Sequence, residues 1–110
     1  MQASIKAGMV ARIERGYSIA DGIGAPFVGE LTLEIAKQYV DDFVSVNDAE
    51  IIDALKMILQ RAKLLVEGAG AATVAAVLTG RANLPKGSRV VCVLSGGNID
   101  LKRVSELIAQ

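Results

Sequence analysis

The sequence contains no histidine, no tryptophan and a single cysteine, Cys92. Without histidine, a Ser-His-Asp triad and most zinc sites are excluded, so no metal site is expected. One cysteine cannot form a disulfide within the chain, which predicts a protein of the reducing cytoplasm. No run approaches the roughly 20 consecutive apolar residues of a membrane-spanning helix. The first residues also lack the apolar core of a signal peptide.

An excess of charge of either sign is absent as well, because 12 Lys and Arg residues balance 12 Asp and Glu residues. Nucleic acids or anionic membranes would require a basic patch, so neither is expected as a partner. Apolar residues are abundant and make up 52% of the 110 residues. This length and composition suffice for one domain with a buried core.

The most informative segment runs from Arg89 to Leu101. Its apolar, β-branched start, Val90–Leu94, predicts a short strand covered on both faces, with Cys92 as a small buried hydrophobe. The run stops at Ser95-Gly96-Gly97-Asn98, where two glycines allow another molecule to approach the backbone. Helical spacing resumes after Asp100. A strand, a glycine turn and a helix start together predict a ligand pocket at the carboxyl end of a strand.

The rest of the chain alternates helical and extended patterns. Asn47 and Glu50 form a capping-box pattern, which predicts a helix that continues to about Lys63. Before it, we expect a helix within residues 1–12 that ends at Gly8 or runs past it, and an ordered and packed glycine-rich loop over 14–29. An amphipathic helix over 30–40, with Leu31 and Ile35 on its apolar side, and a strand over 42–46 are expected next. After it, we expect a helix over 71–78 that is buried nearly all round and ended by Gly80, and a turn over 85–87. This alternation predicts an α/β fold with a parallel sheet. Two strands are too few for a typical sheet, so the chain is expected to be part of a larger domain.

Four places carry candidate chemistry, each with a purely structural alternative. Gly68-Ala69-Gly70 partly matches a dinucleotide-binding fingerprint, but a third glycine and a later acidic residue are missing; the alternative is close packing at a helix entry. Glu67 is expected to be partly buried, as a functional carboxylate or as one stabilised by a helix N-terminus. Asp21-Gly22 fits either an Asx turn or a flat surface for a ring. Ser95 either caps the turn or the next helix, or contacts a ligand.

Three blocks of sequence together resemble one known family. They are Ser18-Ile-Ala-Asp21-Gly22, Lys63-Leu-Leu-Val-Glu67-Gly-Ala-Gly70-Ala and Val93-Leu-Ser95-Gly-Gly-Asn98-Ile-Asp100. In this order and at this spacing they resemble the C-terminal third of pyridoxal-phosphate-dependent threonine dehydratases, enzymes of fold type II related to serine dehydratase and serine racemase. The resemblance covers nearly all of residues 1–110 and implies a partial three-layer α/β domain with a parallel sheet. It also implies that no regulatory ACT domain follows.

The resemblance implies a lyase reaction of amino-acid metabolism, in which threonine or serine loses water to give a 2-oxoacid and ammonia. Pyridoxal phosphate would act as the electron sink. Ser95 would donate a hydrogen bond to the pyridine nitrogen, and its neutral hydroxyl would leave the ring largely unprotonated, which favours elimination over transamination. Gly22 would pass close to the ring with Asp21 beside it, and Glu67 would lie near the 3-hydroxyl of the ring.

Gly96, Gly97 and Asn98 would complete the cofactor-binding turn in this resemblance. Asn98 and Lys63 also match positions that lie near a nucleotide effector in serine racemases. Two family elements are not found in this sequence: the Schiff-base lysine within Ser-x-Lys-x-Arg-Gly, and a run of four glycines for the phosphate. No catalytic residue is therefore expected in this chain, and the chain is expected to be inactive alone.

Exposed apolar faces and sheet edges would favour association with the remainder of the catalytic domain, or with a second copy in a homo-oligomer. The small-molecule partner would be an amino-acid substrate. Three other functions remain open. The chain could be a non-catalytic module that binds a small ligand or nucleotide, a purely structural interaction domain, or a fragment of a serine racemase-like isomerase.

Overall fold

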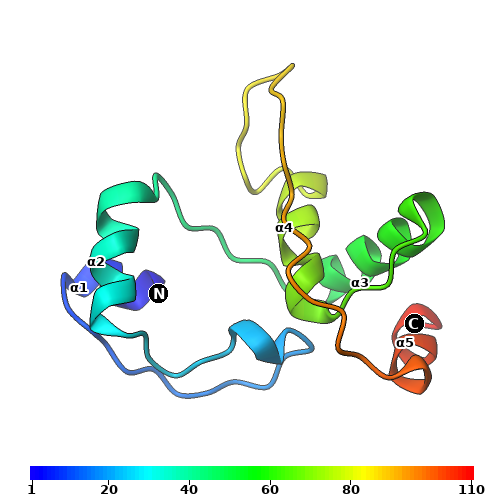
Figure 1. Cartoon of the computed structure of the whole chain (residues 1–110), viewed down its shortest axis with the longest axis horizontal. Coiled ribbons are helices and arrows are strands. Elements are labelled where there is room, and N and C mark those ends of the chain that lie inside the picture. The colour runs from blue at the N-terminus through cyan, green and yellow to red at the C-terminus, as the bar shows by residue number, and fades with distance from the viewer.

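The computed structural model describes all residues 1–110 and consists of helices joined by long loops (Figure 1). The elements are α1 (Gln2–Ala7), the 3₁₀ turn η1 (Asp21–Ile23), α2 (Glu30–Tyr39), α3 (Asp48–Met57), its π-helical continuation η2 (Ile58–Ala62), α4 (Gly68–Leu78) and α5 (Leu101–Ile108). The molecule is flat, with extents of 40 × 35 × 19 Å. α1 and α2 lie on one side, and α3, α4 and α5 pack together on the other (Figure 1). No helix has the length and apolarity needed to span a bilayer.

The start of α3 follows from local sequence alone. Asn47 Oδ1 accepts a hydrogen bond from the backbone N–H of Glu50 at 3.0 Å, and Glu50 Oε2 accepts one from the backbone N–H of Asn47 at 2.7 Å. The predicted capping box is thus confirmed, and the helix continues through η2 to end at Lys63, as expected. Glu50 also pairs with Arg81 at 2.7 Å. The Arg81 hydrogen bond, followed by the one from Asn47, lowers the pKa of the Glu50 carboxyl.

The core lies where α3 crosses α4, and alanine dominates it. Ala54 of α3 and Ala71 and Ala75 of α4 are completely buried. Small side chains allow the two helix axes to approach closely, because the interaxial distance is set by the residues at the contact. Ile51 of α3 and Leu107 of α5 complete the same cluster. This core is the platform that holds the N-terminus of α4.

α4 differs from its predicted form at its start and in the burial of its last turn. It begins at Gly68, three residues before the expected start at Ala71, and its last helical residue is Leu78. Gly80 follows with φ +71°, so the expected glycine stop is confirmed. Burial all round was expected, but Val77 and Leu78 in the last turn are exposed. No other element of the chain packs over this last turn.

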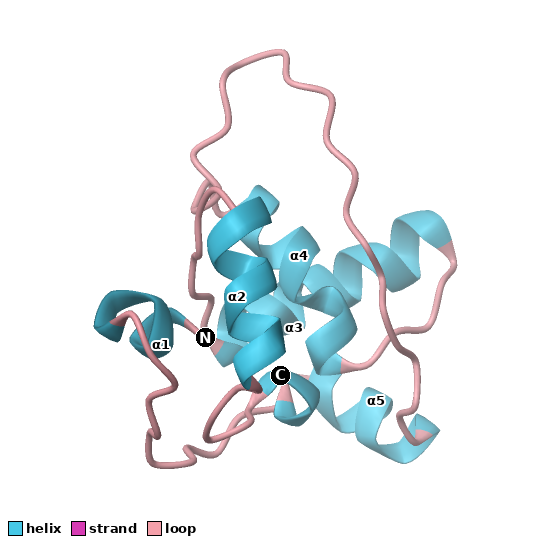
Figure 2. Ribbon diagram, turned by 60° about the vertical axis from the view of Figure 1, so that its left-hand side comes forward, coloured by secondary structure: helices cyan, strands magenta, loops and turns pink.

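The two predicted strands, over 42–46 and 90–94, do not form in this chain. Both segments are loops (Figure 2), and no backbone hydrogen bond joins either of them to another segment. A strand requires a neighbour that pairs with its N–H and C=O groups. The two strand predictions are therefore not confirmed in this chain by itself, because its other segments are helices and turns.

The run Val90–Leu94 is also covered on one face only. Cys92 and Leu94 are half-buried against α4, and the Cys92 Sγ lies 3.9 Å from the Thr73 carbonyl oxygen. The alternate residues point outward: Val91 is 90% exposed and Val93 is 63% exposed. Burial on both faces was expected, and with it a buried Cys92. The structure corrects both expectations, because α4 covers one side and nothing covers the other.

The N-terminal helices form a small lobe. α1 ends at Gly8, whose φ of +72° is left-handed, so the shorter of the two expected helices is the one that forms. Ser4 is buried, and its hydroxyl accepts a hydrogen bond from the backbone N–H of Ala11 at 3.0 Å. Lys37 of α2 donates to the Gly8 carbonyl at 2.8 Å. Hydrogen bonds, rather than an extensive apolar core, therefore fix this lobe.

The apolar residues predicted on one side of α2 are not the residues that this helix buries. Leu33 and Ala36 are the buried residues of this helix. Leu31 and Ile35, predicted on one apolar side of this helix, are exposed, and with Tyr39 they form an outward stripe of apolar side chains. Helical spacing correctly predicted that the stripe exists. It could not predict which side of the helix meets α1.

The glycine-rich loop over 14–29 is confirmed as an irregular segment interrupted only by η1. The backbone N–H of Ile13 donates to the Pro26 carbonyl at 2.9 Å, which joins the outgoing and returning halves of the loop. The Arg12 guanidinium lies 4.2 Å from the Phe27 ring centre. Packing of the loop is partial: Ala20 is buried, but Ile23 and Phe27 are exposed. The turn over 85–87 forms as expected, with the Ser88 N–H donating to the Pro85 carbonyl at 3.1 Å.

Candidate functional site

Three segments far apart in sequence meet at the N-terminus of α4. They are residues 18–22, 65–70 and 95–98, the segments that carry the predicted site residues. The backbone N–H of Glu67 donates to the Gly96 carbonyl at 3.0 Å. The Glu67 carboxylate accepts in return from the backbone N–H of Asn98 at 3.1 Å. Glu67 thus binds the turn over 95–98 through both its backbone and its side chain.

Glu67 is half-buried, as expected from its place between an apolar run and small residues. It is the N-cap residue of α4, but its side chain makes no capping hydrogen bond to that helix. The carboxylate is used instead to hold Asn98. The Glu67 carboxylate therefore fixes the turn over 95–98 and does not cap α4.

The glycines of the 95–98 turn are required by packing within the chain. A Cβ on Gly96 would lie 2.6 Å from Glu67 Oε1, and one on Gly97 would lie 2.9 Å from the Leu65 carbonyl oxygen. On the other side of this contact, a Cβ on Gly70 would lie 2.6 Å from the Gly96 carbonyl oxygen. The sequence suggested that these glycines open the backbone to another molecule. In the structure the close neighbours are Glu67, Leu65 and Gly70 of the same chain.

The loop over 18–22 packs on the other flank of Glu67. A Cβ on Gly68 would overlap the backbone carbonyl of Ile19, and one on Gly22 would lie 3.2 Å from the Ala69 Cβ and 3.5 Å from Glu67 Oε1. Gly68 and Gly70 therefore serve close packing at a helix entry, the alternative that the sequence left open beside dinucleotide binding.

Asp21 and Gly22 begin the 3₁₀ turn η1, in which the Gly24 N–H donates to the Asp21 carbonyl at 3.1 Å. The Asp21 carboxylate is exposed and accepts no hydrogen bond, so the Asx turn does not form. Gly22 is exposed and lies beside Glu67. These two residues are thus placed next to Glu67 with their exposed sides free.

Ser95 is exposed, and its hydroxyl makes no hydrogen bond within the chain. The α5 helix has Asp100 as its N-cap, so the serine caps neither that helix nor the turn. Its neighbour Gly96 is tied to Glu67, which fixes the position of the Ser95 backbone. An unpaired hydroxyl on a fixed turn is available to donate to a ligand atom.

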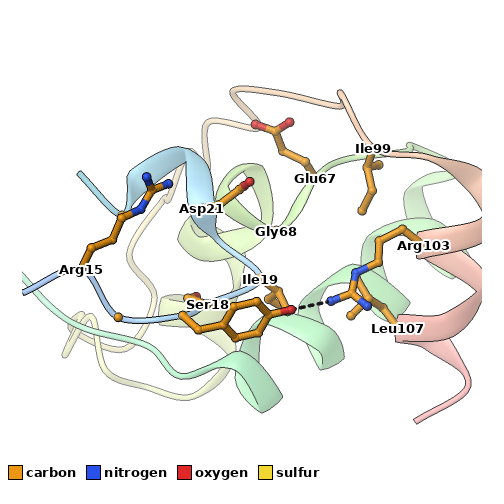
Figure 3. Close-up of a pocket in the computed structure, with 12 residues that line it drawn as sticks. Arg15, Ser18, Ile19, Asp21, Glu67, Gly68, Ile99, Arg103 and Leu107 are labelled. Atoms are coloured by element: carbon orange, nitrogen blue, oxygen red, sulfur yellow. Dashed lines mark hydrogen bonds between the residues drawn. The ribbon is translucent and has the colours of Figure 1, made fainter. Parts of the chain in front are cut away.

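A cavity of about 400 Å³ opens beside these segments (Figure 3). Arg15 and Arg103 lie at opposite ends of it, with Asp21 and Glu67 between them (Figure 3). Arg103 donates to the Tyr17 hydroxyl at 3.3 Å and pairs with Glu106 at 3.2 Å. The two arginines were not among the predicted site residues, because single charges in a loop and on a helix face form no recognisable pattern.

Lys63, which the sequence placed near a nucleotide effector, is engaged at the end of η2. The Lys63 ammonium donates to the Gln60 carbonyl at 2.7 Å and so caps the end of η2. No group of three or more Cys, Asp or Glu side chains is arranged to hold a metal ion. The resulting site is a frame of backbone contacts that carries three polar side chains: the free Ser95 hydroxyl, the Glu67 carboxylate bound to Asn98, and the free Asp21 carboxylate.

Comparison with known proteins identifies the type of molecule that shares this arrangement. Residues 1–96 match the family model described as pyridoxal-phosphate dependent enzyme. The chain is 45% identical over 108 residues to L-threonine ammonia-lyase of Thermotoga maritima, an alignment that covers 98% of this chain and 26% of that protein. Among solved structures, the threonine deaminase of T.th. superposes with a TM-score of 0.82 at 35% identity, over 90% of this chain and 35% of that one.

Serine racemase of maize also superposes, with a TM-score of 0.82 at 33% identity, over 97% of this chain and 33% of that one. The chain therefore spans about a quarter to a third of the length of the relatives it matches. Its fold is that of the corresponding part of these enzymes, in agreement with the expected α/β segment, although this chain contains no strand of its own. The chain belongs to the family of pyridoxal-phosphate-dependent enzymes.

Proposed function

We propose that this chain is the C-terminal part of a threonine or serine dehydratase and forms the pyridine-nitrogen side of its pyridoxal phosphate site. The observation that carries the proposal is the unpaired Ser95 hydroxyl on a turn that Glu67 fixes through two hydrogen bonds. The similarity to L-threonine ammonia-lyase over 98% of the chain supports the same reaction class. The substrate would be threonine, converted to 2-oxobutanoate and ammonia.

The residues present fit this cofactor. When bound, pyridoxal phosphate supplies the electron sink for the loss of water. Ser95 offers a neutral hydroxyl, which can donate to an aromatic nitrogen without stabilising a positive charge on it as a carboxylate would. Gly22 is exposed beside Glu67, so its backbone is accessible to a flat ring. Glu67 is occupied by Asn98 through one oxygen, and its Oε1 remains free of hydrogen bonds within the chain.

The roles of the chain's own residues follow from these contacts. Glu67 and Asn98 hold the turn, so the Ser95 donor is placed before any ligand arrives; such preorganisation avoids a reorganisation cost during the reaction. From the opposite loop, Asp21 lines the same cavity as Glu67, and Gly22 lies beside Glu67 without lining that cavity. The Schiff-base lysine and the phosphate-binding glycines would come from the remainder of the enzyme, so this chain alone would be inactive.

A chimera tests the proposal. The chain replaces the matched segment of the Thermotoga maritima L-threonine ammonia-lyase, and 2-oxobutanoate release from threonine is measured with pyridoxal phosphate present. Ser95→Ala is expected to lower kcat by about 10- to 100-fold, because one hydrogen bond to the reacting ring system is lost. Ser105→Ala, at an exposed serine on α5, is the matched control and should leave kcat unchanged.

Three results would contradict the proposal: an inactive chimera that still binds the cofactor, equal activity of Ser95→Ala and the parent, or nucleotide binding by this chain without restored activity. The last result would favour a non-catalytic binding module instead.

We also propose that residues 90–94 become a strand of a parallel sheet whose other strands belong to the rest of the enzyme. The alternating exposure of Val91, Cys92, Val93 and Leu94 is the pattern of a strand with one face covered. The backbone groups of this segment are free, apart from the Val93 carbonyl, which accepts from the Thr73 hydroxyl at 3.1 Å. A partner that adds strands would satisfy these groups and cover Val91 and Val93.

Amide hydrogen exchange would reveal such a strand. The amides of residues 90–94 are expected to exchange about 100-fold or more slowly in the chimera than in this chain alone, since ladder amides of a core strand exchange only after cooperative opening. Ala75 is buried in α4, so its amide is expected to be protected in both proteins and serves as the reference. Equal exchange rates for residues 90–94 in the two proteins would show that no strand is added.

A further inference from the structure

The first turn of α3 contains an acidic residue that the capping box leaves unused. Asn47 and Glu50 complete the box between themselves. Asp48 lies between them and directs its carboxylate across to the distant loop over 18–22. Its Oδ1 accepts from the Ser18 hydroxyl at 2.6 Å, and its Oδ2 accepts from the backbone N–H of Ile19 at 3.3 Å.

These bonds extend one residue further along the loop. Ser18 Oγ accepts in turn from the backbone N–H of Ala20 at 3.1 Å. Three consecutive residues are thus fixed by one carboxylate immediately before the turn that holds Gly22. Hydrogen bonds to a carboxylate are stronger than neutral ones, and a negative charge in the first turn of a helix is favoured by the helix dipole.

Residues 18–20 have little room to shift from the position in which these bonds hold them. Ile19 and Ala20 pack against the core, and the Ile19 carbonyl presses on Gly68. Gly22 follows so close to its neighbours that even a Cβ would lie 3.2 Å from the Ala69 Cβ, tighter than an ordinary contact, and 3.5 Å from Glu67 Oε1. A small shift of residues 18–20 would therefore move Gly22 relative to Glu67 and to the Ser95 turn.

We propose that Asp48 is a positioning residue that sets the Gly22 side of the cofactor site from outside that site. The inference rests on the proposed function, because it concerns the ring surface that Gly22 would offer. Asp48 touches no residue of the 95–98 turn and is not among the cavity residues. It acts through Ser18 and Ile19, as an anchor between α3 and the loop.

The test is Asp48→Asn in the same chimera, with two measurements. Asparagine keeps one acceptor oxygen and replaces the other with a donor, so one of the two bonds to the loop is lost. Without cofactor, amide exchange at Ile19 and Ala20 is expected to accelerate about tenfold or more. With cofactor, the Kd for pyridoxal phosphate is expected to rise about tenfold, and the visible absorbance of the bound cofactor to shift.

Asp53→Asn is the matched control: it makes the same substitution on the same helix, at an exposed carboxylate without a hydrogen bond, and should change neither measurement. Ser18→Ala removes both bonds of the hydroxyl, to Asp48 and from the Ala20 N–H, and keeps the bond from Ile19 to Asp48. Its Ile19 exchange and its Kd decide the question if Asp48→Asn does not fold. This variant should reproduce the same two effects.

Faster exchange at Ile19 and Ala20 with an unchanged Kd and absorbance would overturn the inference, since Asp48 would then have only a structural role. Unchanged exchange would overturn it as well. Failure of the proposed function is recognised separately, by a Ser95→Ala variant as active as the parent.

Discussion

Replacing Gly68 with alanine is expected to push the loop over 18–22 away from α4 and to lower the free energy of unfolding by about 1–3 kcal/mol or more. The added Cβ would overlap the Ile19 backbone carbonyl, and its next neighbour is the Ala20 backbone nitrogen at 3.2 Å. Backbone atoms cannot rotate away as the end of a flexible side chain can. The loop must shift as a unit, and Asp48 opposes this shift through Ser18 and Ile19.

Urea unfolding measures the change in free energy, and amide exchange at Ala20 measures the detachment of the loop. Gly16→Ala is the control, because Gly16 has no atom within 4 Å of its Cβ position and its φ is not in the left-handed region. A Gly68→Ala variant as stable as Gly16→Ala, with unchanged exchange at Ala20, would contradict the packing described for the entry to α4.

Leu107→Ala is expected to lower the free energy of unfolding by about 2–5 kcal/mol, the range for removing a large buried aliphatic side chain. Leu107 is 2% exposed and belongs to the central core cluster. Val104 is the only other buried residue of α5, so two side chains attach this helix to α3. Loss of Leu107 should release α5, and with it the downstream anchor of the Ser95 turn.

Thermal or urea unfolding measures this effect, and Leu101→Ala is the control on the same helix. Leu101 is 74% exposed, so its truncation should change the free energy of unfolding by no more than about 0.5 kcal/mol. Equal destabilisation by the two variants would mean that α5 does not pack through Leu107. In the chimera, Leu107→Ala should also weaken cofactor binding, since the turn over 95–98 lies between α4 and α5.

Helices were the best predicted part of the fold because their signals are local. The Asn47–Glu50 box begins α3 where expected, and Gly8 and Gly80 terminate helices with left-handed φ. The predicted strands are not confirmed in this chain, because strand formation depends on a partner. Residues 90–94 have the composition of a buried strand, yet the chain contributes nothing that pairs with them.

The candidate site was likewise predicted only in part. Three short blocks indicated which segments matter, and the structure brings Gly22, Glu67, Gly96, Gly97 and Asn98 together. The spacing gave no indication that Gly96 and Gly97 make room for Glu67 and Leu65 of the same chain. It also gave no reason to connect Asp48 with Ser18, thirty residues earlier.

By itself, the sequence determined where α3 begins, which glycine ends α4, which residue types gather in the three blocks, and the family that those blocks resemble. These properties depend on neighbouring residues and on identity along the chain. Only the tertiary structure decided which face of α2 is buried, that Val91 and Val93 remain uncovered, and that Glu67 engages Asn98 while Ser95 stays free. Each of these outcomes depends on which distant groups come within a few ångströms, and packing of the whole chain sets those distances.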